Sequence, residues 1–402
     1  MNILIYRWDI YPYDNIIETF QKEGHLTDVL SFPIQNHIDD KDFTPVLQAK
    51  LSKTGYDMVF SVNYYAVIAT ICAEYNIPYA TWTCDSPLLS LRHPSILFPT
   101  SYIFCFDKKE YNTLVQKNAP HAYYLPLAGM PPETSFTADI DSAKQDFPSN
   151  YEYEVSFVGN LYDKNRYDEM CLCLPKYLCG YFDAAIEAQK NIGAGNLLPQ
   201  MLNDNILADL IKYTKVINGD SSPEELRIHF ATSVLSYKTA ADLRIDALNA
   251  LACKYPVTLF TSGHTKQLWN VDCRPAVSYQ KEMPKIFASS KINLNFTIPN
   301  IENGIPLRVF DVLAAGGFLL TDYREELCSQ FENGTDLVIF EGIPDLIQKA
   351  GYYLSHGEER RQIAKNGQKK IQQSHQYSMR LNEIIQCIFQ HNDSRPNAEY
   401  FK

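Results

Sequence analysis

The pattern of apolar and polar positions is clearest between residues 291 and 322, where two short apolar runs flank a polar loop and an amphipathic segment. In order, the pattern predicts a buried strand at Ile292–Phe296, a polar loop at Thr297–Gly304, a helix entered at Pro306, a break at Gly316 and Gly317, and a second buried strand at Phe318–Thr321. Proline suits the first turn of a helix, and glycine suits its end. A strand, a helix and a second strand in this order predict one βαβ unit with parallel strands.

The polar loop of this unit is expected at the carboxyl end of the first strand, next to the start of the helix. An open α/β sheet binds its ligand at that position, and the N–H groups and dipole of a helix N-terminus attract an anion such as phosphate. The polar residues best placed to use it are Asn303, Arg308 and Asp311. The unit therefore predicts a site for a phosphorylated ligand.

Apolar strands and amphipathic helices alternate through most of the chain, which predicts an α/β fold with doubly wound parallel sheets. Residues 129–150 interrupt the alternation and form a predicted linker, because they are rich in Pro, Ser, Thr and Asp. We expect an N-terminal domain at 1–128, a C-terminal domain at 151–376, and a last helix with the tail at 377–402. Within the second domain, 168–230 is mainly helical and too long for an ordinary loop, so we expect a helical insertion.

Length and composition are those of a two-domain globular protein, with 402 residues, 46% hydrophobic and 21% charged. The net charge of −11 argues against a general nucleic-acid binder or an anchor to an anionic membrane. The ten cysteines read as reduced thiols because no export signal precedes them, and no apolar run is long enough to span a membrane. We therefore expect a cytoplasmic protein without a nucleic-acid partner.

The loop after the first predicted strand, Arg7 to Tyr13, contains no glycine. This disfavours a dinucleotide-binding fold with its pyrophosphate at the N-terminal domain. Several other stretches resemble the glycosyltransferases related to the spore maturation protein CgeB, a GT-B branch close to family-one transferases. They are ILIYRWD near the start, YATWTCDSP from Tyr79, YIFCFDKKEY from Tyr102, YLPLAG from Tyr124, SFVGNLY from Ser156, EMPKIFASSKINLNFT from Glu282 and RVFDVLAAGGFLLTD from Arg308.

The resemblance covers nearly the whole chain outside the insertion. It implies two facing Rossmann-like domains, a nucleotide-sugar donor held mainly by the C-terminal domain, an acceptor met by the N-terminal domain, and a last helix that crosses back. Retaining members of the related group carry two glutamates eight positions apart. Here Asp311 occupies the second position and Asn303 the first, with Glu302 one residue away. The missing first carboxylate leaves the stereochemical outcome of transfer open.

Donor-binding candidates lie where the predicted strands of the C-terminal domain end. Arg308 is expected to fork onto the diphosphate and Asp311 to accept hydrogen bonds from ribose hydroxyls. An ion pair between these two residues is the structural alternative. Gly159 would let a phosphate approach the backbone. The other candidates are Asn160, Lys164 and Arg166 in the same loop as Gly159, and Gly263 and Tyr279 near the expected nucleoside base.

Asp85 is the candidate catalytic base, because it follows the predicted strand Tyr79–Trp82 in the domain expected to meet the acceptor. A base has to lie within hydrogen-bond reach of the acceptor hydroxyl, whose oxygen loses its proton as it attacks the anomeric carbon. A helix-capping role is the structural alternative for Asp85. The other acceptor-side candidates are Trp8, Asp9 and His93.

These features predict a glycosyltransferase that moves a sugar from a nucleoside-diphosphate sugar, such as a UDP-sugar, to a hydroxyl of a protein or surface glycan. It would use no cofactor, because the nucleotide sugar is a substrate. The one Asp-x-Asp motif, at Asp139–Asp141, lies in the predicted linker, so we expect no required metal. Two alternatives stay open, namely a sugar-nucleotide epimerase of the same architecture and a GT-B-like binding protein whose active site has decayed.

Overall fold

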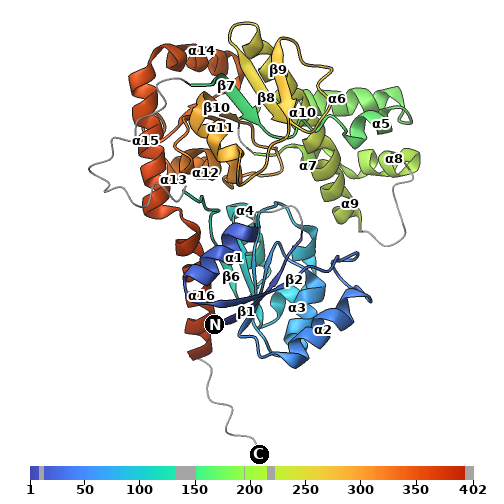
Figure 1. The fold of residues 1–402 in the computed structure, drawn as a ribbon. Coiled ribbons are helices and arrows are strands. Elements are labelled where there is room, and N and C mark those ends of the chain that lie inside the picture. The colour runs from blue at the N-terminus through green and yellow to red at the C-terminus, as the bar shows by residue number, and fades with distance from the viewer. Residues whose placement is uncertain (9–12, 132–150, 194, 215–221, 394–402) are drawn as a thin grey trace, which may run out of the picture. The chain divides into compact units, whose positions relative to one another are not determined.

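The computed structural model of the chain describes residues 1–8, 13–131, 151–193, 195–214 and 222–393. The chain forms two compact units. Figure 1 colours the chain by residue number, from blue at the N-terminus to red at the C-terminus. Unit 1 consists of Met1–Met130 with Ser374–Lys402, and unit 2 consists of Pro131–Gln373. None of the helices in the described ranges is both long and apolar enough to cross a membrane.

Unit 1 is built on a parallel six-stranded sheet in the order β2-β1-β3-β4-β5-β6. Its strands are β1 (Asn2–Tyr6), β2 (Leu26–Leu30), β3 (Met58–Val62), β4 (Tyr79–Trp82), β5 (Ser101–Cys105) and β6 (Ala122–Tyr124). Its helices are α1 (Tyr13–Lys22), α2 (Phe43–Lys53), α3 (Ala66–Glu74), α4 (Lys108–Gln116) and α16 (Tyr377–Asp393), with short 3-10 helices η1 (Leu89–Arg92) and η2 (Pro94–Leu97). Because β1 lies between β2 and β3, the strand order reverses between β1 and β3.

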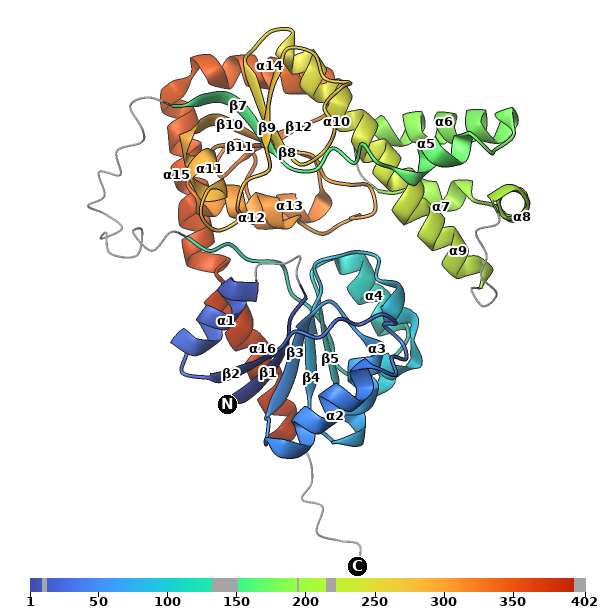
Figure 2. The same ribbon diagram turned by 45° about the vertical axis from the view of Figure 1, so that its right-hand side comes forward.

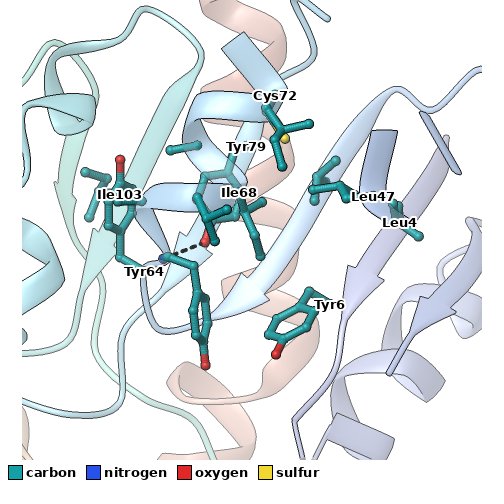
Figure 3. Packing of buried hydrophobic residues seen from close by; sticks show 14 of the residues in the cluster. Leu4, Tyr6, Leu47, Tyr64, Ile68, Cys72, Tyr79 and Ile103 are labelled. Carbon is teal, nitrogen blue, oxygen red and sulfur yellow. Dashed lines mark hydrogen bonds between the residues drawn. The ribbon is translucent and has the colours of Figure 1, made fainter. Parts of the chain in front are cut away.

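The core of unit 1 forms where the apolar strands meet α2 and α3. Figure 3 draws members of this core from β1 (Leu4), α2 (Leu47), α3 (Ile68) and β4 (Tyr79). Every residue of β3, β4 and β5 is buried, as expected for central strands of a parallel sheet whose two faces are both covered. The buried strands therefore fix the positions of the loops that follow them.

The last helix, α16, belongs to unit 1 although it follows unit 2 in the sequence. It contacts α1, and Nε of Arg380 donates to the carbonyl oxygen of Pro126 at 3.0 Å. Tyr377 packs edge-on against the buried Trp82, with ring centroids 5.8 Å apart. The chain thus returns to its first unit at its end.

Unit 2 contains a second parallel six-stranded sheet, in the order β12-β11-β10-β7-β8-β9. Its strands are β7 (Tyr153–Val158), β8 (Val257–Thr261), β9 (Val271–Pro275), β10 (Ser290–Asn295), β11 (Leu319–Asp322) and β12 (Val338–Phe340). The helices that accompany this sheet are α10 (Tyr237–Ala252), α11 (Met283–Ser289), α12 (Leu307–Ala314), α13 (Glu325–Gln330), α14 (Gly342–Ser355) and α15 (Gly357–Ser374). The predicted βαβ unit is confirmed, because β10, α12 and β11 follow one another and the two strands pair in parallel.

Two glycines explain the sharp end of α12. Gly316 has a φ of 77°, in the left-handed region that glycine adopts without strain. A Cβ on Gly317 would lie 2.7 Å from Nδ2 of Asn293 and 2.8 Å from the carbonyl oxygen of Phe287. The chain can therefore turn directly from α12 into β11 and lie close against β10.

Between β7 and α10, a group of helices forms an insertion with an apolar core of its own. The segments are α5 (Arg166–Cys171), α6 (Lys176–Lys190), α7 (Leu198–Met201), α8 (Asp204–Thr214), α9 (Pro223–Phe230) and the π-helical segment Ala231–Ser236 that leads into α10. Figure 2 shows these helices grouped beside the sheet of unit 2. Because the group buries its own apolar side chains, it can be long without disturbing the sheet.

Candidate functional site

The carboxyl ends of the parallel strands in unit 2 meet at one edge of its sheet. β7 lies between β8 and β10, so the strand order reverses between β7 and β10. In an open parallel sheet, ligands bind outside the carboxyl ends of the strands at such a reversal. The residues that follow β7, β8, β10 and β11 therefore make up the candidate site of this unit.

Asp311, Arg308 and Tyr279 form a hydrogen-bonded group at this edge. Asp311 and Arg308 lie on α12, and Tyr279 lies between β9 and α11. The Tyr279 hydroxyl donates to Oδ1 of Asp311, and Nη1 of Arg308 donates to Oδ2 at 3.2 Å. Arg308 also contacts Sδ of Met283 and lies 5.4 Å from the centroid of the Phe287 ring. Three predicted donor-binding residues are thus brought together, and the ion pair of the structural alternative is present as well.

The environment of Asp311 changes its titration. Burial raises the pKa of Asp311 to about 6, although the charge of Arg308 and the hydrogen bond from Tyr279 act in the opposite direction. The side chain is 12% exposed. Near neutral pH the carboxylate is ionised and can accept hydrogen bonds, whereas mildly acidic solution converts it to the neutral acid.

Asn303 lies in the loop between β10 and α12, where the resemblance implied a carboxylate in retaining enzymes. Its Nδ2 donates to Oε2 of Glu325, in the first turn of α13, at 2.9 Å. The structure therefore places a carboxylate from α13, the helix after β11, next to the position that lacks one in the sequence.

The loop after β7 places its predicted residues in different surroundings. The Gly159 N–H donates to a carbonyl of β8 at 3.1 Å and so extends the ladder between the strands. The Asn160 side chain accepts from the Tyr162 N–H at 2.6 Å, in a turn where Tyr162 has a φ of 54°. Lys164 and Arg166 are both exposed. Their role toward a diphosphate stays a prediction.

Gly263 follows β8, and its lack of a side chain has a reason within the protein. A Cβ at this position would lie 2.4 Å from Oδ1 of Asp163, in the loop after β7. Oδ2 of the same carboxylate accepts a hydrogen bond from the His264 N–H at 2.9 Å. The glycine therefore leaves room for the Asp163 carboxylate, which joins the loop after β7 to the loop after β8.

Arg244, on α10, was not among the sequence-based candidates, yet it lies at the strand reversal. Its Nη1 donates to the Asn160 carbonyl at 2.5 Å, and its Nη2 donates to the Phe296 carbonyl at 2.7 Å. The sequence did carry a signal: Arg244, Ala247 and Leu248 have the spacing of one helix face, and all are buried. An arginine on a buried face needs polar partners, because burying its charge alone is costly.

A second polar group fixes the ends of β10 and β11. Oδ1 of Asp322 accepts from the N–H of Thr297 at 3.0 Å and from its hydroxyl at 2.8 Å. Arg324 forms an ion pair with Asp322 at 3.1 Å and donates to the Thr297 carbonyl at 3.2 Å. The loop that follows β10 therefore starts from a position fixed by β11.

In unit 1, Asp85 follows β4 and is held by Asn63, which follows β3. Nδ2 of Asn63 donates to Oδ2 of Asp85 at 2.7 Å. Oδ1 of Asn63 accepts from the N–H groups of Cys84 at 2.9 Å and Asp85 at 3.3 Å. Asn63 has a φ of 62°, a conformation in which asparagine is enriched. A residue from the neighbouring strand thus orients the candidate base.

The turn that carries Asp85 is fixed at its other end as well, because the Leu88 N–H donates to Oε2 of Glu110 at 3.1 Å. Asp85 is exposed to solvent, but the protein around the carboxylate still removes part of its hydration and raises its pKa, against the effect of the Asn63 hydrogen bond. The residue that caps the next helix, η1, is Leu88 rather than Asp85. Asp85 therefore does not cap this helix, as the structural alternative required. Its position and raised pKa suit a general base.

The acceptor-side candidates have mixed positions. Nε1 of Trp8 donates to the Val62 carbonyl at 3.2 Å, and the ring packs against the core of unit 1. Nδ1 of His93 accepts from the Ser95 N–H at 3.2 Å at the start of η2. Asp9 lies outside the described residues. Trp8 and His93 therefore have structural partners, and their contact with an acceptor stays a prediction.

Residues 243–386, less than half of the chain, match the model of a protein family described as glycosyl transferase-like. The matched segment contains Arg244, Tyr279, Arg308 and Asp311. No curated protein matches the chain in sequence. The narrower resemblance to CgeB-related enzymes stays a prediction.

Solved structures show the fold. Anabaena Alr3699/HepE in complex with UDP matches with a TM-score of 0.57 and 11% identity, covering 98% of this chain and 100% of that chain. Sucrose-phosphate synthase (tll1590) from Thermosynechococcus elongatus matches with a TM-score of 0.51 and 10% identity, covering 97% of this chain and 99% of that chain. The predicted α/β GT-B fold with two Rossmann-like units is confirmed.

Proposed function

We propose that this chain is a glycosyltransferase that moves a sugar from a nucleoside-diphosphate sugar to a hydroxyl of a protein or surface glycan. The observation that carries the proposal is the group formed by Asp311, Arg308 and Tyr279. It lies at the carboxyl edge of the second sheet, inside the segment that matches the glycosyl transferase-like family. A Rossmann-like sheet binds nucleotides at this edge, and HepE, which has the same fold, was solved with UDP.

The chemistry of the group suits a nucleotide sugar. The Asp311 carboxylate accepts hydrogen bonds from vicinal ribose hydroxyls, and the Arg308 guanidinium has further donors for diphosphate oxygens. As the glycosidic bond breaks, negative charge develops on the diphosphate, and a fixed cation stabilises it. We therefore assign donor binding to unit 2, with a UDP-sugar as the first donor to test.

Unit 1 supplies the candidate base. In an inverting transfer, the acceptor oxygen attacks the anomeric carbon, the nucleoside diphosphate leaves with the bonding electrons, and the hydroxyl proton passes to the base. We assign this role to Asp85, because Asn63 holds its carboxylate in a fixed orientation. Protein cations such as Arg308 would stabilise the negative charge of the departing diphosphate in place of a metal ion. We therefore expect transfer to persist in EDTA.

Donor binding can be tested by thermal shift with UDP, GDP, dTDP and their hexose conjugates. A ligand that binds only the folded state stabilises it, by about 2.7 kcal/mol at a concentration of 100 times its Kd. We expect at least one nucleotide to stabilise the wild type and Asp311→Ala to abolish that shift. Asp345→Ala is the matched control, because Asp345 also pairs with a cation on its own helix, Lys349, at 2.7 Å. Absence of any shift in the wild type would contradict donor binding.

Two further outcomes separate the proposed function from its alternatives. NMR of the bound nucleotide sugar, incubated with the protein alone, should show an unchanged sugar configuration, and conversion to an epimer would favour an epimerase. If the wild type binds a nucleotide sugar but shows no turnover that Asp311→Ala could reduce, a binding protein without transferase activity is the better account.

A further inference from the structure

Arg244 is a buried cation at the strand reversal of unit 2. Arg244 is 7% exposed. Its Nε atom is buried and makes no hydrogen bond within the described part of the chain. Burial lowers its pKa, but guanidinium stays charged in proteins. Burying the charge of Arg244 costs free energy, so the presence of an arginine at this buried position calls for an explanation.

The hydrogen bonds of Arg244 connect the two loops that flank the reversal. Nη1 donates to the carbonyl of Asn160, after β7, and Nη2 donates to the carbonyl of Phe296, after β10. One planar guanidinium therefore fixes the distance between the two backbone segments at the point where a Rossmann-like sheet receives its ligand.

The surroundings of Arg244 hold its charge without a carboxylate bonded to it. The guanidinium lies 4.7 Å from the ring centroid of Tyr162 and 5.4 Å from that of Phe157. Within the described ranges it forms no ion pair. Burial disfavours the charge of Arg244, Tyr162 and then Asp322 favour it, and Arg308 opposes it. Two arginines that repel each other near one edge of a sheet are stabilised when an anion binds there.

The predicted cations of the β7 loop do not supply this buried charge, because Lys164 and Arg166 are both exposed. The N–H of Asn160, an exposed residue, donates no hydrogen bond among the residues that the structure describes. The carbonyl of the same residue is turned to Arg244. Asn160 thus offers its N–H as a donor, and its carbonyl is bonded to the charged Arg244. Both features suit a bound anion.

We propose that Arg244 is a positioning residue for the diphosphate of the donor. Its two carbonyl hydrogen bonds hold the loops after β7 and β10 in the geometry that receives the diphosphate, and its charge favours that anion. The inference rests on the proposed function, since it assumes a nucleoside diphosphate as ligand, but it adds a residue that does not itself need to touch the donor.

Calorimetric titration of the full chain with UDP, GDP, dTDP, their monophosphates and their nucleosides tests the proposal. For the diphosphate that the wild type binds, we expect Arg244→Met to weaken binding by about tenfold or more, because it removes a fixed positive charge near the anion together with the hydrogen bonds that hold the two loops. The affinity for the corresponding nucleoside should change less than twofold. This selectivity for the diphosphate is the readout that a general structural defect would not produce.

Arg360 offers a matched control at the opposite edge of the same sheet. It is 3% exposed, donates from Nη1 to the Tyr353 carbonyl, and has a buried Nε without a hydrogen bond in the described residues. It also lies 5.2 Å from the ring centroid of Tyr151, just before β7 begins. Arg360→Met should destabilise the protein but leave the affinity ratio of diphosphate to nucleoside unchanged.

Arg244→Lys serves if Arg244→Met does not fold, because lysine keeps the charge but lacks the planar fork. We expect it to weaken diphosphate binding by about threefold, again without a matching loss for the nucleoside. Equal losses for diphosphate and nucleoside, or a ratio that changes as much in Arg360→Met, would overturn the role of Arg244 alone. A wild type that binds none of the diphosphates would contradict the proposed function.

Discussion

The hydroxyl of Tyr279 donates a hydrogen bond to the carboxylate of Asp311, which ties the segment between β9 and α11 to α12. The two residues lie 32 positions apart in the sequence, and both were predicted to face the donor. Their contact joins the expected nucleoside side of the site to the expected ribose and diphosphate side. It also makes the charge state of Asp311 depend on Tyr279, since this hydrogen bond lowers the pKa of Asp311 against the effect of burial.

Asp311→Asn should weaken nucleotide binding and stabilise the ligand-free protein. The pKa of Asp311 rises from an ordinary 3.8 to about 6 in the folded state, so the folded protein binds a proton more tightly than the unfolded chain. Ionisation of Asp311 therefore lowers the free energy of unfolding as pH rises from about 4 to about 6. Since each pKa unit is worth 1.36 kcal/mol, the variant should gain about 3 kcal/mol at pH 8.

Urea denaturation of wild type and Asp311→Asn at pH 4 and pH 8 measures this difference. The gain should be below about 1 kcal/mol at pH 4, where the wild-type carboxyl is protonated in the folded state and about half ionised in the unfolded chain, and it should be full at pH 8. A stability difference that does not depend on pH would contradict the role of Asp311 ionisation.

Tyr279→Phe should move the pH dependence of nucleotide binding. Without the hydroxyl, the carboxylate of Asp311 loses a hydrogen bond that favours its ionised form, so its pKa rises above about 6. Affinity for UDP, measured by calorimetry between pH 5 and pH 8, should then begin to fall at a higher pH than in the wild type. Tyr181→Phe is the control, because its hydroxyl donates to the carbonyl of Met201 in the insertion rather than to a carboxylate. An unchanged midpoint in Tyr279→Phe would contradict the coupling.

The βαβ unit from β10 to β11 could be predicted because its signals are local. Apolar runs, Pro306 and the Gly316–Gly317 pair each act within a few residues, and they also put Arg308 and Asp311 on α12. Local signals were weaker for β9 (Val271–Pro275), an edge strand whose residues are half-buried or exposed. That strand was not predicted, since no apolar period marks it.

The contacts that shape the two candidate sites depend on tertiary structure. Asn63 meets Asp85 because β3 and β4 are neighbours in the sheet, and no periodicity within one segment reports that pairing. Arg244 differs, because its position on the apolar face of α10 is visible in the sequence but its carbonyl partners lie in two distant loops. Lys164 and Arg166 carry the more usual local sign of a phosphate site, since they are cations in the loop after a strand, yet both are exposed.

Gly263→Ala should destabilise the protein by about 1–3 kcal/mol, the range for overpacking. The added Cβ would lie 2.4 Å from Oδ1 of Asp163 and so displace this carboxylate, which would lose its hydrogen bond from the His264 N–H. Gly180→Ala is the matched control. Gly180 lies inside α6 with nothing within 4 Å of its Cβ position, so alanine should stabilise the helix by about 1 kcal/mol. Equal effects of the two substitutions in urea denaturation would contradict the packing role of Gly263.

Asn63→Gly should raise the pKa of Asp85 and slow transfer without weakening donor binding. Glycine keeps the left-handed φ of 62° but removes the amide that donates to the Asp85 carboxylate, and that hydrogen bond lowers the pKa of Asp85. Carbon-13 NMR of labelled aspartate should show Asp85 titrating at a higher pH, with Asp85→Asn identifying its signal.

Asn118→Gly is the control, because Asn118 has a φ of 58° and is exposed in the same unit. Since a base protonated at higher pH is less available, the acid limb of kcat/KM should shift upward only in Asn63→Gly. If Asp85→Asn retains full turnover, Asp85 is not the base, whatever Asn63 does to its titration.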